Sequence, residues 1–159
     1  MSTSKRPPFF PMMIDLNGRH VLIIGGGVIA SRRACTLLRC GAKITAVSPD
    51  FSPEFPENTH RIKRPFRPED ITSEISLVVS AADNREVNHF VYGTAKSKLI
   101  PVNVADCQEE CDFFFPSMIN SQNIAACVCS AGVSPSLTHR LSERLRKVWQ
   151  LWINEENNT

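Results

Sequence analysis

The strongest constraint on the fold is a glycine-rich loop between an expected strand and an expected helix. Residues 19–24 (RHVLII) form a continuous apolar run, which is typical of a strand buried on both faces. Three glycines follow at 25–27, and the next segment, 28–40, has apolar residues at helical spacing up to Gly41, a helix stop signal. A second strand at 43–47 (KITAV) completes a β-loop-α-β unit.

The loop itself matches the G-x-G-x-x-G/A pattern of dinucleotide-binding proteins. Gly25 permits the tight turn, Gly27 lets the backbone approach a pyrophosphate, and Ala30 lets the helix pack closely on the strand. Free N–H groups at the helix N-terminus attract the negative charge of the phosphates. We therefore predict cofactor contacts from Gly25, Gly27, Val28, Ile29 and Ala30. A glycine turn that binds nothing is the alternative.

Strands and helices alternate along the rest of the first two-thirds of the chain. Residues 75–82 (ISLVVSAA) and 99–104 (LIPVNV) are expected strands, with a helix between them from about residue 86 to residue 97. The segment 51–68 is rich in proline and charge and predicts a loop with at most one weak strand. This alternation predicts a parallel sheet with right-handed crossovers. The expected fold class is α/β, a Rossmann-type parallel sheet with helices on both faces.

The pattern changes after Cys111. Residues 112–118 (DFFFPSM) and 124–129 (IAACVC) are strand-like and flank a polar turn at 120–123, which predicts a hairpin. A last helix is expected to begin after Ser134 as N-cap, with Pro135 at its first position. We therefore expect a small C-terminal α+β unit beside the parallel sheet.

Composition excludes several classes of protein. The net charge of +2, from 18 basic and 16 acidic residues, is too small to predict nucleic-acid or anionic-membrane binding. No apolar run approaches the roughly 20 residues of a membrane span. Prolines 7, 8 and 11 interrupt the N-terminal apolar residues, so a secretion signal is not expected and the predicted location is cytoplasmic.

The six cysteines stand at positions 35, 40, 107, 111, 127 and 129 without an even framework. In a cytoplasmic protein they should be reduced thiols. A four-thiolate metal site built from the last four is the alternative, although neither pair has the usual two-residue gap. We predict no metal.

Polar residues after the second expected strand bear on the choice of cofactor. An acidic residue that binds the ribose is expected there, but Ser48 and Pro49 occupy the place and Asp50 comes two or three positions late. Ser48 and Pro49 are predicted to contact the cofactor, and Ser48 or Asp50 could bond the ribose. Arg32 and Arg33 could favour a 2′-phosphate, or they could be solvated helix charges. The residues alone leave NAD and NADP open.

Further polar residues follow the later strands. Asp83 and Asn84 come after 75–82 and are predicted on the nicotinamide side of the cofactor. Asn103 is also predicted to bind the cofactor, and it could orient the loop that carries Asp106. Asp106 stands just past 99–104, at the carboxyl edge where open α/β sheets bind ligands. A carboxylate held there can accept a proton from a substrate. A turn-capping role is the alternative for Asp106.

Taken in order, these segments resemble the precorrin-2 dehydrogenase family, which includes bifunctional siroheme synthases that also insert iron. The resemblance covers about residues 9–150, from PMMIDLNGRHVLIIGGGVIASRRACTLLRCGAKITAVSPD through LVVSAADNREVN and IPVNVADCQEECDFFFPS to CSAGVSPSL. It implies oxidation of precorrin-2 to sirohydrochlorin with NAD, on the way to siroheme, by a homodimer. Family members usually continue past the last helix for some tens of residues, so we expect the helical C-terminal segment to be largely absent here.

The resemblance also assigns roles to residues. Asp106 matches the general acid/base, and Ser130 lies in a motif near the tetrapyrrole pocket. The substrate carries many carboxylates, for which arginine offers a planar fork. Arg140 and Arg144 are the predicted substrate-binding residues, with a solvated helix face as the alternative. Further candidate cations are Arg85, Arg146 and Lys147.

The expected organisation is an NAD(P)-binding domain at 1–111 and a dimerisation and substrate-pocket unit at 112–159. Two rival functions stay open: a bifunctional dehydrogenase and ferrochelatase in which His139 assists, and a nucleotide- or tetrapyrrole-binding module without turnover. The hairpin and last helix carry more apolar surface than a monomer of this size can cover, so we expect a dimer to bury it. The residues concerned are Phe113, Phe115, Leu141, Leu145, Trp149 and Trp152.

Overall fold

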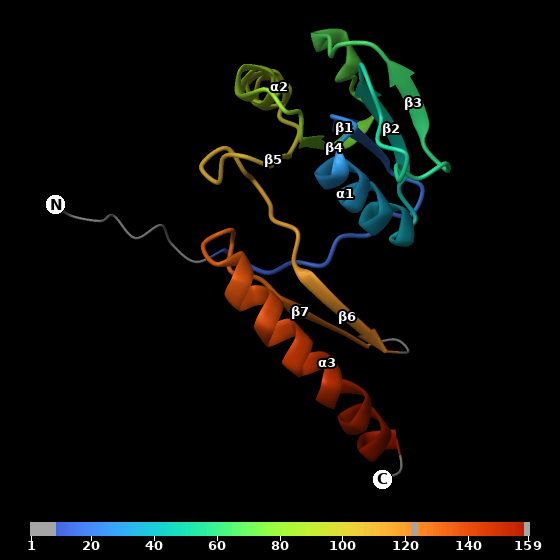
Figure 1. Cartoon of the computed structure of the whole chain (residues 1–159), viewed down its shortest axis with the longest axis vertical. Coiled ribbons are helices and arrows are strands. Elements are labelled where there is room, and N and C mark those ends of the chain that lie inside the picture. Colours follow the sequence, from blue (N-terminus) through green and yellow to red (C-terminus); the bar gives the residue numbers. More distant parts are fainter. Residues whose placement is uncertain (1–8, 122–123, 158–159) are drawn as a thin grey trace, which may run out of the picture.

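A computed structural model describes residues 9–121 and 124–157 of the chain. Five parallel strands form one sheet in the order β3-β2-β1-β4-β5 (Figure 1). Their bounds are β1 (His20–Ile24), β2 (Lys43–Ser48), β3 (His60–Lys63), β4 (Ile75–Ser80) and β5 (Val102–Val104). This order is that of a Rossmann sheet, with its topological switch point between β1 and β4.

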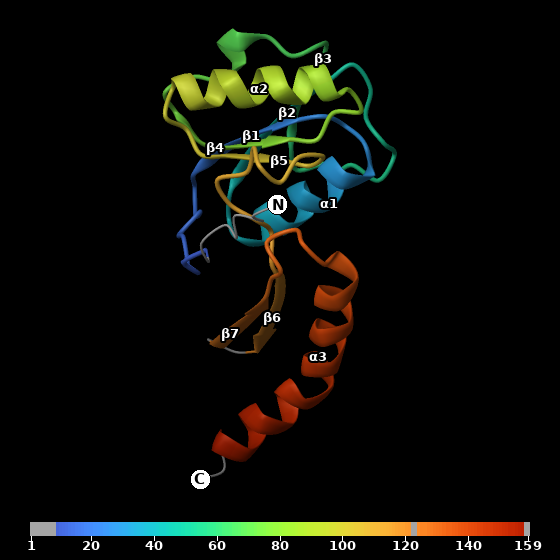
Figure 2. The ribbon, with the colours of Figure 1, turned by 90° about the vertical axis from the view of Figure 1, so that its left-hand side faces the viewer.

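Two helices cover opposite faces of the sheet. Figure 2 shows the sheet in the middle, with α1 (Val28–Arg39) below it and α2 (Arg85–Ser97) above it. Ala30 and Ala34 of α1 join the core on one face, and Val91 of α2 joins the core on the other. Successive residues of β1 alternate between these two cores, as the period of a strand requires. The predicted fold class is confirmed.

The strand ends differ from the prediction at one place. The expected strand 99–104 begins only at Val102, because Leu99 and Ile100 still close the end of α2 through bonds from their N–H groups to Lys96 and Ala95 carbonyls. Leu99 also has a left-handed φ of 57°, which no strand residue adopts. The short β3 is the weak strand expected within 51–68, and a 3-10 turn at Pro68–Asp70 follows it.

The remainder of the chain lies outside the parallel sheet. An antiparallel pair, β6 (Ser117–Ser121) and β7 (Ile124–Val128), packs against the long helix α3 (Pro135–Asn157). Both figures show this unit projecting away from the five-stranded sheet (Figures 1 and 2). Of the helices that the structure describes, none combines the length and the apolar character needed to cross a bilayer.

The expected strand at 112–118 is wrong over its first five residues: residues 112–116 form an irregular linker, and strand structure begins only with β6 at Ser117. The Asp112 N–H donates to the Val102 carbonyl at 2.9 Å, so the linker covers the free edge of β5. Its aromatic rings pack on the parallel domain, with Phe113 and Phe115 on the α1 face and Phe114 on the α2 face. The predicted turn also shifts: Asn120 and Ser121 belong to β6, and residues 122–123 lie outside the described part.

One side of α3 packs on the hairpin and the other is exposed. Ser142 and Ile153 are buried, and Arg146 donates to Ser117 Oγ at 3.0 Å and to the Met118 carbonyl at 3.4 Å. The exposed apolar residues of α3 are Leu137, Leu141, Leu151 and Trp152. Of the six residues expected to be covered by a dimer, Phe113 and Phe115 are instead packed within the chain.

Candidate functional site

The glycine loop is shaped by close backbone contacts. Gly25 has a φ of 117°, and a Cβ there would lie 2.2 Å from the Ala81 carbonyl oxygen, so only glycine fits. A Cβ on Gly26 would lie 2.0 Å from the Asp50 carbonyl oxygen. Gly26 was not among the predicted residues, since the G-x-G-x-x-A pattern leaves its position free, and only the fold brings Asp50 against it.

Gly27 differs from its neighbours because it faces open space. Apart from Gly27 and its two neighbours in the chain, no atom lies within 4 Å of the position that its Cβ would take. It is the N-cap of α1, where the structure gives no side-chain cap and no acidic residue in the first turn. The next two residues, Val28 and Ile29, are exposed, whereas Ala30 is fully buried against the sheet. The free N–H groups and the open approach fit a pyrophosphate.

The two predicted cofactor residues at the end of β2 differ in their burial. Ser48 is buried and Pro49 is exposed. Arg33 packs on the linker: its guanidinium lies 5.2 Å from the centre of the Phe115 ring, and Nη1 is buried without a partner among the described residues. Burial lowers the pKa of Arg33. Arg33 is therefore not the solvated helix charge that was one alternative, whereas Arg32 is exposed.

The carboxyl ends of the central strands lie side by side. The Ala81 N–H donates to the Ile24 carbonyl at 2.7 Å, and the Ala105 N–H donates to the Ser80 carbonyl at 2.8 Å. These bonds continue the sheet past β1, β4 and β5. The glycine loop, the turn after β4 and the loop after β5 therefore share one edge, as open α/β sites require.

The turn after β4 holds two of the predicted cofactor residues. Asp83 is exposed. Asn84 is the N-cap of α2, and its Oδ1 accepts from the N–H groups of Glu86 at 2.8 Å and Val87 at 3.1 Å. Its carboxamide oxygen is therefore engaged in holding the helix, while the residue as a whole is exposed at the edge.

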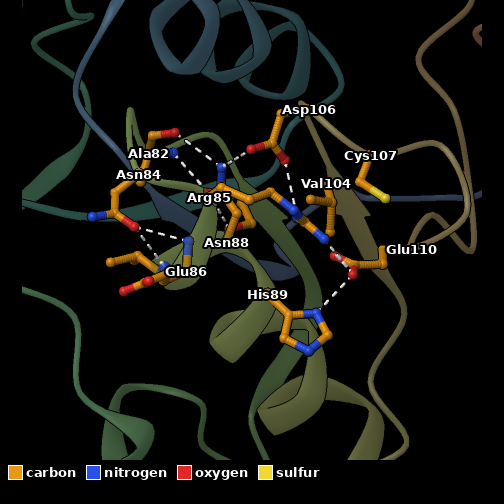
Figure 3. A network of polar contacts seen from close by, with 12 residues as sticks. Ala82, Asn84, Arg85, Glu86, Asn88, His89, Val104, Asp106, Cys107 and Glu110 are labelled. Atoms are coloured by element: carbon orange, nitrogen blue, oxygen red, sulfur yellow. Dashed lines mark hydrogen bonds and ion pairs between the residues drawn. The ribbon is translucent and has the colours of Figure 1, made fainter.

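Asp106 lies at the same edge, and α2 holds both of its carboxylate oxygens (Figure 3). Oδ2 accepts from Asn88 Nδ2 at 2.9 Å, and Oδ1 accepts from Arg85 Nη1 at 3.2 Å. The Asp106 side chain keeps 39% of its surface exposed. It is thus fixed in orientation and open to a substrate, which is the condition for a general acid or base.

Arg85 extends this arrangement into a chain of charges. It donates through Nη2 to Glu110, and the His89 ring contacts the same carboxylate at 2.7 Å (Figure 3). The hydrogen bond between Arg85 and Glu110 is the main cause of two pKa shifts. It lowers the pKa of Glu110 and raises the pKa of Arg85. Arg85 was predicted only as a cation for substrate carboxylates, and Glu110 was missed, because no sequence pattern links positions 85 and 110.

Asn103 is placed inside the protein and not on the open edge. It is 3% exposed, and its Nδ2 donates to the Phe113 carbonyl at 2.6 Å and to Cys111 Sγ at 3.4 Å. Its Oδ1 is buried without a partner among the described residues. The structure therefore gives Asn103 a contact to the linker, and its contact with the cofactor stays a prediction.

Ser130 lies in the turn that leads into α3. Its hydroxyl accepts from the Ser134 N–H at 3.0 Å and from Thr138 Oγ1 at 2.9 Å. Two residues after Asp106, Gln108 donates through Nε2 to the Gly132 carbonyl at 2.5 Å. This bond brings the Ser130 turn to the loop that carries Asp106, although the two are separated by more than twenty residues in the sequence.

The predicted substrate arginines are exposed on α3. Arg140 and Arg144 line a groove of ≈ 330 Å³. The rest of its lining is Leu137, His139, Leu141 and Glu143. A larger cavity of ≈ 530 Å³ lies at the C-terminal end of α2 against Lys98 and Ile100, at the amino edge of the sheet and away from Asp106.

The thiols do not gather into a metal centre in the described part of the chain. None of the six cysteines forms a disulfide in the described part of the chain, and no group of three or more His, Cys, Asp or Glu side chains is placed to hold an ion among the residues that the structure covers. Cys111 is buried, and its sulfur accepts from the Val104 N–H at 3.2 Å. The structure thus gives this thiol a packing role behind β5.

Fold and site together define a Rossmann-type dinucleotide-binding protein. A family model described as "Putative NAD(P)-binding" matches residues 12–117. The chain belongs to the siroheme synthase N-terminal (precorrin-2 dehydrogenase) family, and it contains an NAD(P)-binding domain.

Relatives and a solved structure support this membership. Siroheme synthase 2 of Aeromonas salmonicida is 42% identical over 144 residues, which are 88% of this chain and 30% of that protein. The siroheme synthase of Photorhabdus laumondii is 37% identical over 142 residues, 86% of this chain and 30% of its own length. The chain thus spans about three tenths of these relatives. The precorrin-2 dehydrogenase SirC superposes with a TM-score of 0.75 at 31% identity, covering 87% of this chain and 70% of SirC.

Proposed function

We propose that this protein oxidises precorrin-2 to sirohydrochlorin with NAD as the hydride acceptor. The observation that carries the proposal is the position of Asp106, a partly exposed carboxylate held by α2 at the same sheet edge as the glycine loop. The likeness to SirC, a precorrin-2 dehydrogenase, suggests the substrate. A division into a nucleotide-binding domain at 1–111 and a pocket unit at 112–159 is part of the proposal.

The N-terminal end of α1 would hold the dinucleotide. The uncapped N–H groups after Gly27 would donate to the pyrophosphate, while Val28 and Ile29 would cover it with apolar surface. Ser48 ends β2 and Pro49 follows it, while Asp83 and Asn84 lie beyond the end of β4. These four residues would contact the ribose and nicotinamide ends. When bound, the nicotinamide ring supplies the chemistry of hydride acceptance.

Asp106 would remove the proton that accompanies hydride loss. The net reaction takes one hydride and one proton from the tetrapyrrole, so the carboxylate must be ionised and directed at the carbon that is deprotonated. Arg85 and Asn88 leave one side of the carboxylate exposed while they fix its plane. The carboxylate then transfers its proton to water after the product leaves.

The carboxylates of the substrate require fixed cations. Arg140 and Arg144 are exposed on successive turns of α3 and would each pair with an acetate or propionate group. The Ser130 turn would complete the pocket, since Gln108 joins it to the Asp106 loop. Arg146 does not belong to this set, because it already bonds Glu143 and the hairpin.

A homodimer is part of the same proposal. The exposed apolar side of α3, with Leu137, Leu141, Leu151 and Trp152, is large for one chain to leave in water. A second copy that packs its own α3 and hairpin there would bury this surface in a two-fold interface.

An anaerobic assay of the purified protein tests the proposal. Precorrin-2 with NAD should give sirohydrochlorin and NADH in equal amounts, and parallel reactions with NADP decide the cofactor. No product with either cofactor would contradict the dehydrogenase proposal and favour a binding module. Iron-containing siroheme formed from sirohydrochlorin and Fe²⁺ faster than without protein would show that the bifunctional alternative holds.

A further inference from the structure

Asn88 is a fully buried asparagine whose carboxamide joins the cofactor side of the site to Asp106. It lies in the first turns of α2 and is 0% exposed. Its Oδ1 accepts from Ser80 Oγ at 2.7 Å and from the Ala82 N–H at 3.0 Å. Its Nδ2 donates to the Ala82 carbonyl at 2.9 Å and to Asp106 Oδ2 at 2.9 Å (Figure 3).

The backbone of Ala82 fixes which end of this amide faces Asp106. An N–H can only donate and a carbonyl can only accept, so Ala82 holds Oδ1 against its N–H and Nδ2 against its carbonyl. A flipped carboxamide would lose both bonds and bring its oxygen to a carboxylate. The remaining Nδ2 hydrogen must therefore point at Asp106.

This contact connects Asp106 to the backbone that lies beside the glycine loop. Ala81, the residue before Ala82, is the one whose carbonyl blocks a side chain on Gly25. Asn88 thus bonds the end of β4, beside the glycine loop, and the carboxylate after β5. Arg85 holds the other carboxylate oxygen, but it is exposed and shares its guanidinium with Glu110.

We propose that Asn88 is the positioning residue that fixes Asp106 relative to the bound dinucleotide. The proposal rests on the proposed function of Asp106 as the base. A buried amide with all four partners satisfied is rigid, whereas an exposed ion pair is mobile and contributes little. Asn88 therefore sets the distance and plane of the carboxylate, and Arg85 supplies charge.

The Asn88→Asp variant removes the donor while it keeps the size and shape of the side chain. One oxygen can still accept from Ser80 and Ala82, but the other now faces Asp106. We expect kcat to fall roughly 10- to 100-fold, the cost of misplacing a catalytic group by about 1 Å. KM for NAD should stay near the wild-type value, because the pyrophosphate contacts lie at Gly27.

A double-variant cycle separates positioning from general loss of structure. If Asn88 acts through Asp106, adding Asn88→Asp to Asp106→Asn should lower the rate no further. Val91→Ala is the matched control, since Val91 is fully buried one turn along α2 and belongs to the apolar core. Its kcat should equal the wild-type value. A full further loss in the double variant, or a wild-type kcat in Asn88→Asp, would overturn the proposal.

A wild-type measurement keeps the contact testable even if Asn88→Asp does not fold. The two Nδ2 proton resonances of Asn88 should shift in ¹⁵N NMR spectra when Asp106 is titrated with acid, and should not shift in Asp106→Asn. Resonances that behave alike in both proteins would overturn the contact itself. Absence of turnover in a wild-type protein with the expected shifts would instead overturn the proposed function.

Discussion

Replacing Gly27 by valine isolates dinucleotide binding from folding. Apart from Gly27 and its two chain neighbours, no atom lies within 4 Å of the Cβ position. The backbone at Gly27 has φ −77° and ψ −173°, a conformation that valine adopts readily. The substitution weakens an N-cap and should cost about 1 kcal/mol of stability, out of the roughly 5–15 kcal/mol typical of a folded domain. The variant should therefore fold.

The effect on binding is much larger. The valine methyl groups would fill the space through which a pyrophosphate reaches the N–H groups of α1. Loss of two hydrogen bonds to a charged group costs about 1.5–3 kcal/mol each, or about 3–6 kcal/mol together. This corresponds to a dissociation constant for NAD roughly 10²- to 10⁴-fold higher.

Calorimetric titration with NAD measures this loss, and circular dichroism shows that the variant is folded. Gly93→Val is the matched control, because Gly93 also faces open space but lies on α2 away from the loop; its NAD affinity should equal the wild-type value. Gly26→Ala should instead destabilise the fold, because its Cβ would clash with the Asp50 carbonyl. A folded Gly27→Val protein with wild-type affinity for NAD would refute the assignment of the loop.

Three further variants test other parts of the structure. Trp152→Glu places a charge on a side chain that is 51% exposed in one chain; light scattering at micromolar concentration should show a dimer for the wild type and a monomer for the variant, and equal masses would contradict the interface. Gly93→Ala should raise stability by about 0.5–1 kcal/mol and Tm by roughly 1–4 °C, with a lower Tm as the contrary result. The hydrogen bond from Arg64 lowers the pKa of Asp70. The ion pair therefore stabilises the folded state at pH values above the ordinary carboxyl pKa, and this stabilisation is lost as the pH falls below about 4. The free energy of unfolding of Asp70→Asn should therefore be lower at pH 7, and it should change less than that of the wild type as the pH falls below about 4. An acid unfolding profile equal to that of the wild type would contradict the stabilising role of the Arg64–Asp70 pair.

The parallel sheet and its glycine loop were predictable because their signals are local. The apolar run before Gly25, the helical spacing after Gly27 and the next strand all lie within one short segment. The linker was mispredicted for the opposite reason. Phe113 and Phe115 have high strand propensity, but they are partly buried against the core on the α1 face of the sheet, and only the tertiary structure places them there.

The polar surroundings of Asp106 were beyond sequence reasoning. The position of Asp106 after an expected strand indicated a candidate base, yet Asn88 reads as an ordinary polar residue of a helix. Its four bonds come from β4, the turn after it and the loop after β5. Such a residue is recognisable only when several chain segments are placed together, and Glu110 was missed for the same reason.

The most direct test of the central claim compares the wild type with Asp106→Asn at saturating NAD and precorrin-2 under anaerobic conditions. Asparagine keeps the size of the side chain, and its one carbonyl oxygen can still accept from either Asn88 or Arg85, but it cannot take a proton. We expect NADH and sirohydrochlorin formation to fall by a factor on the order of 10² to 10⁴, while calorimetry gives an NAD affinity near that of the wild type. An unchanged rate would remove Asp106 from the mechanism, and a simultaneous loss of NAD affinity would make it a structural residue of the loop.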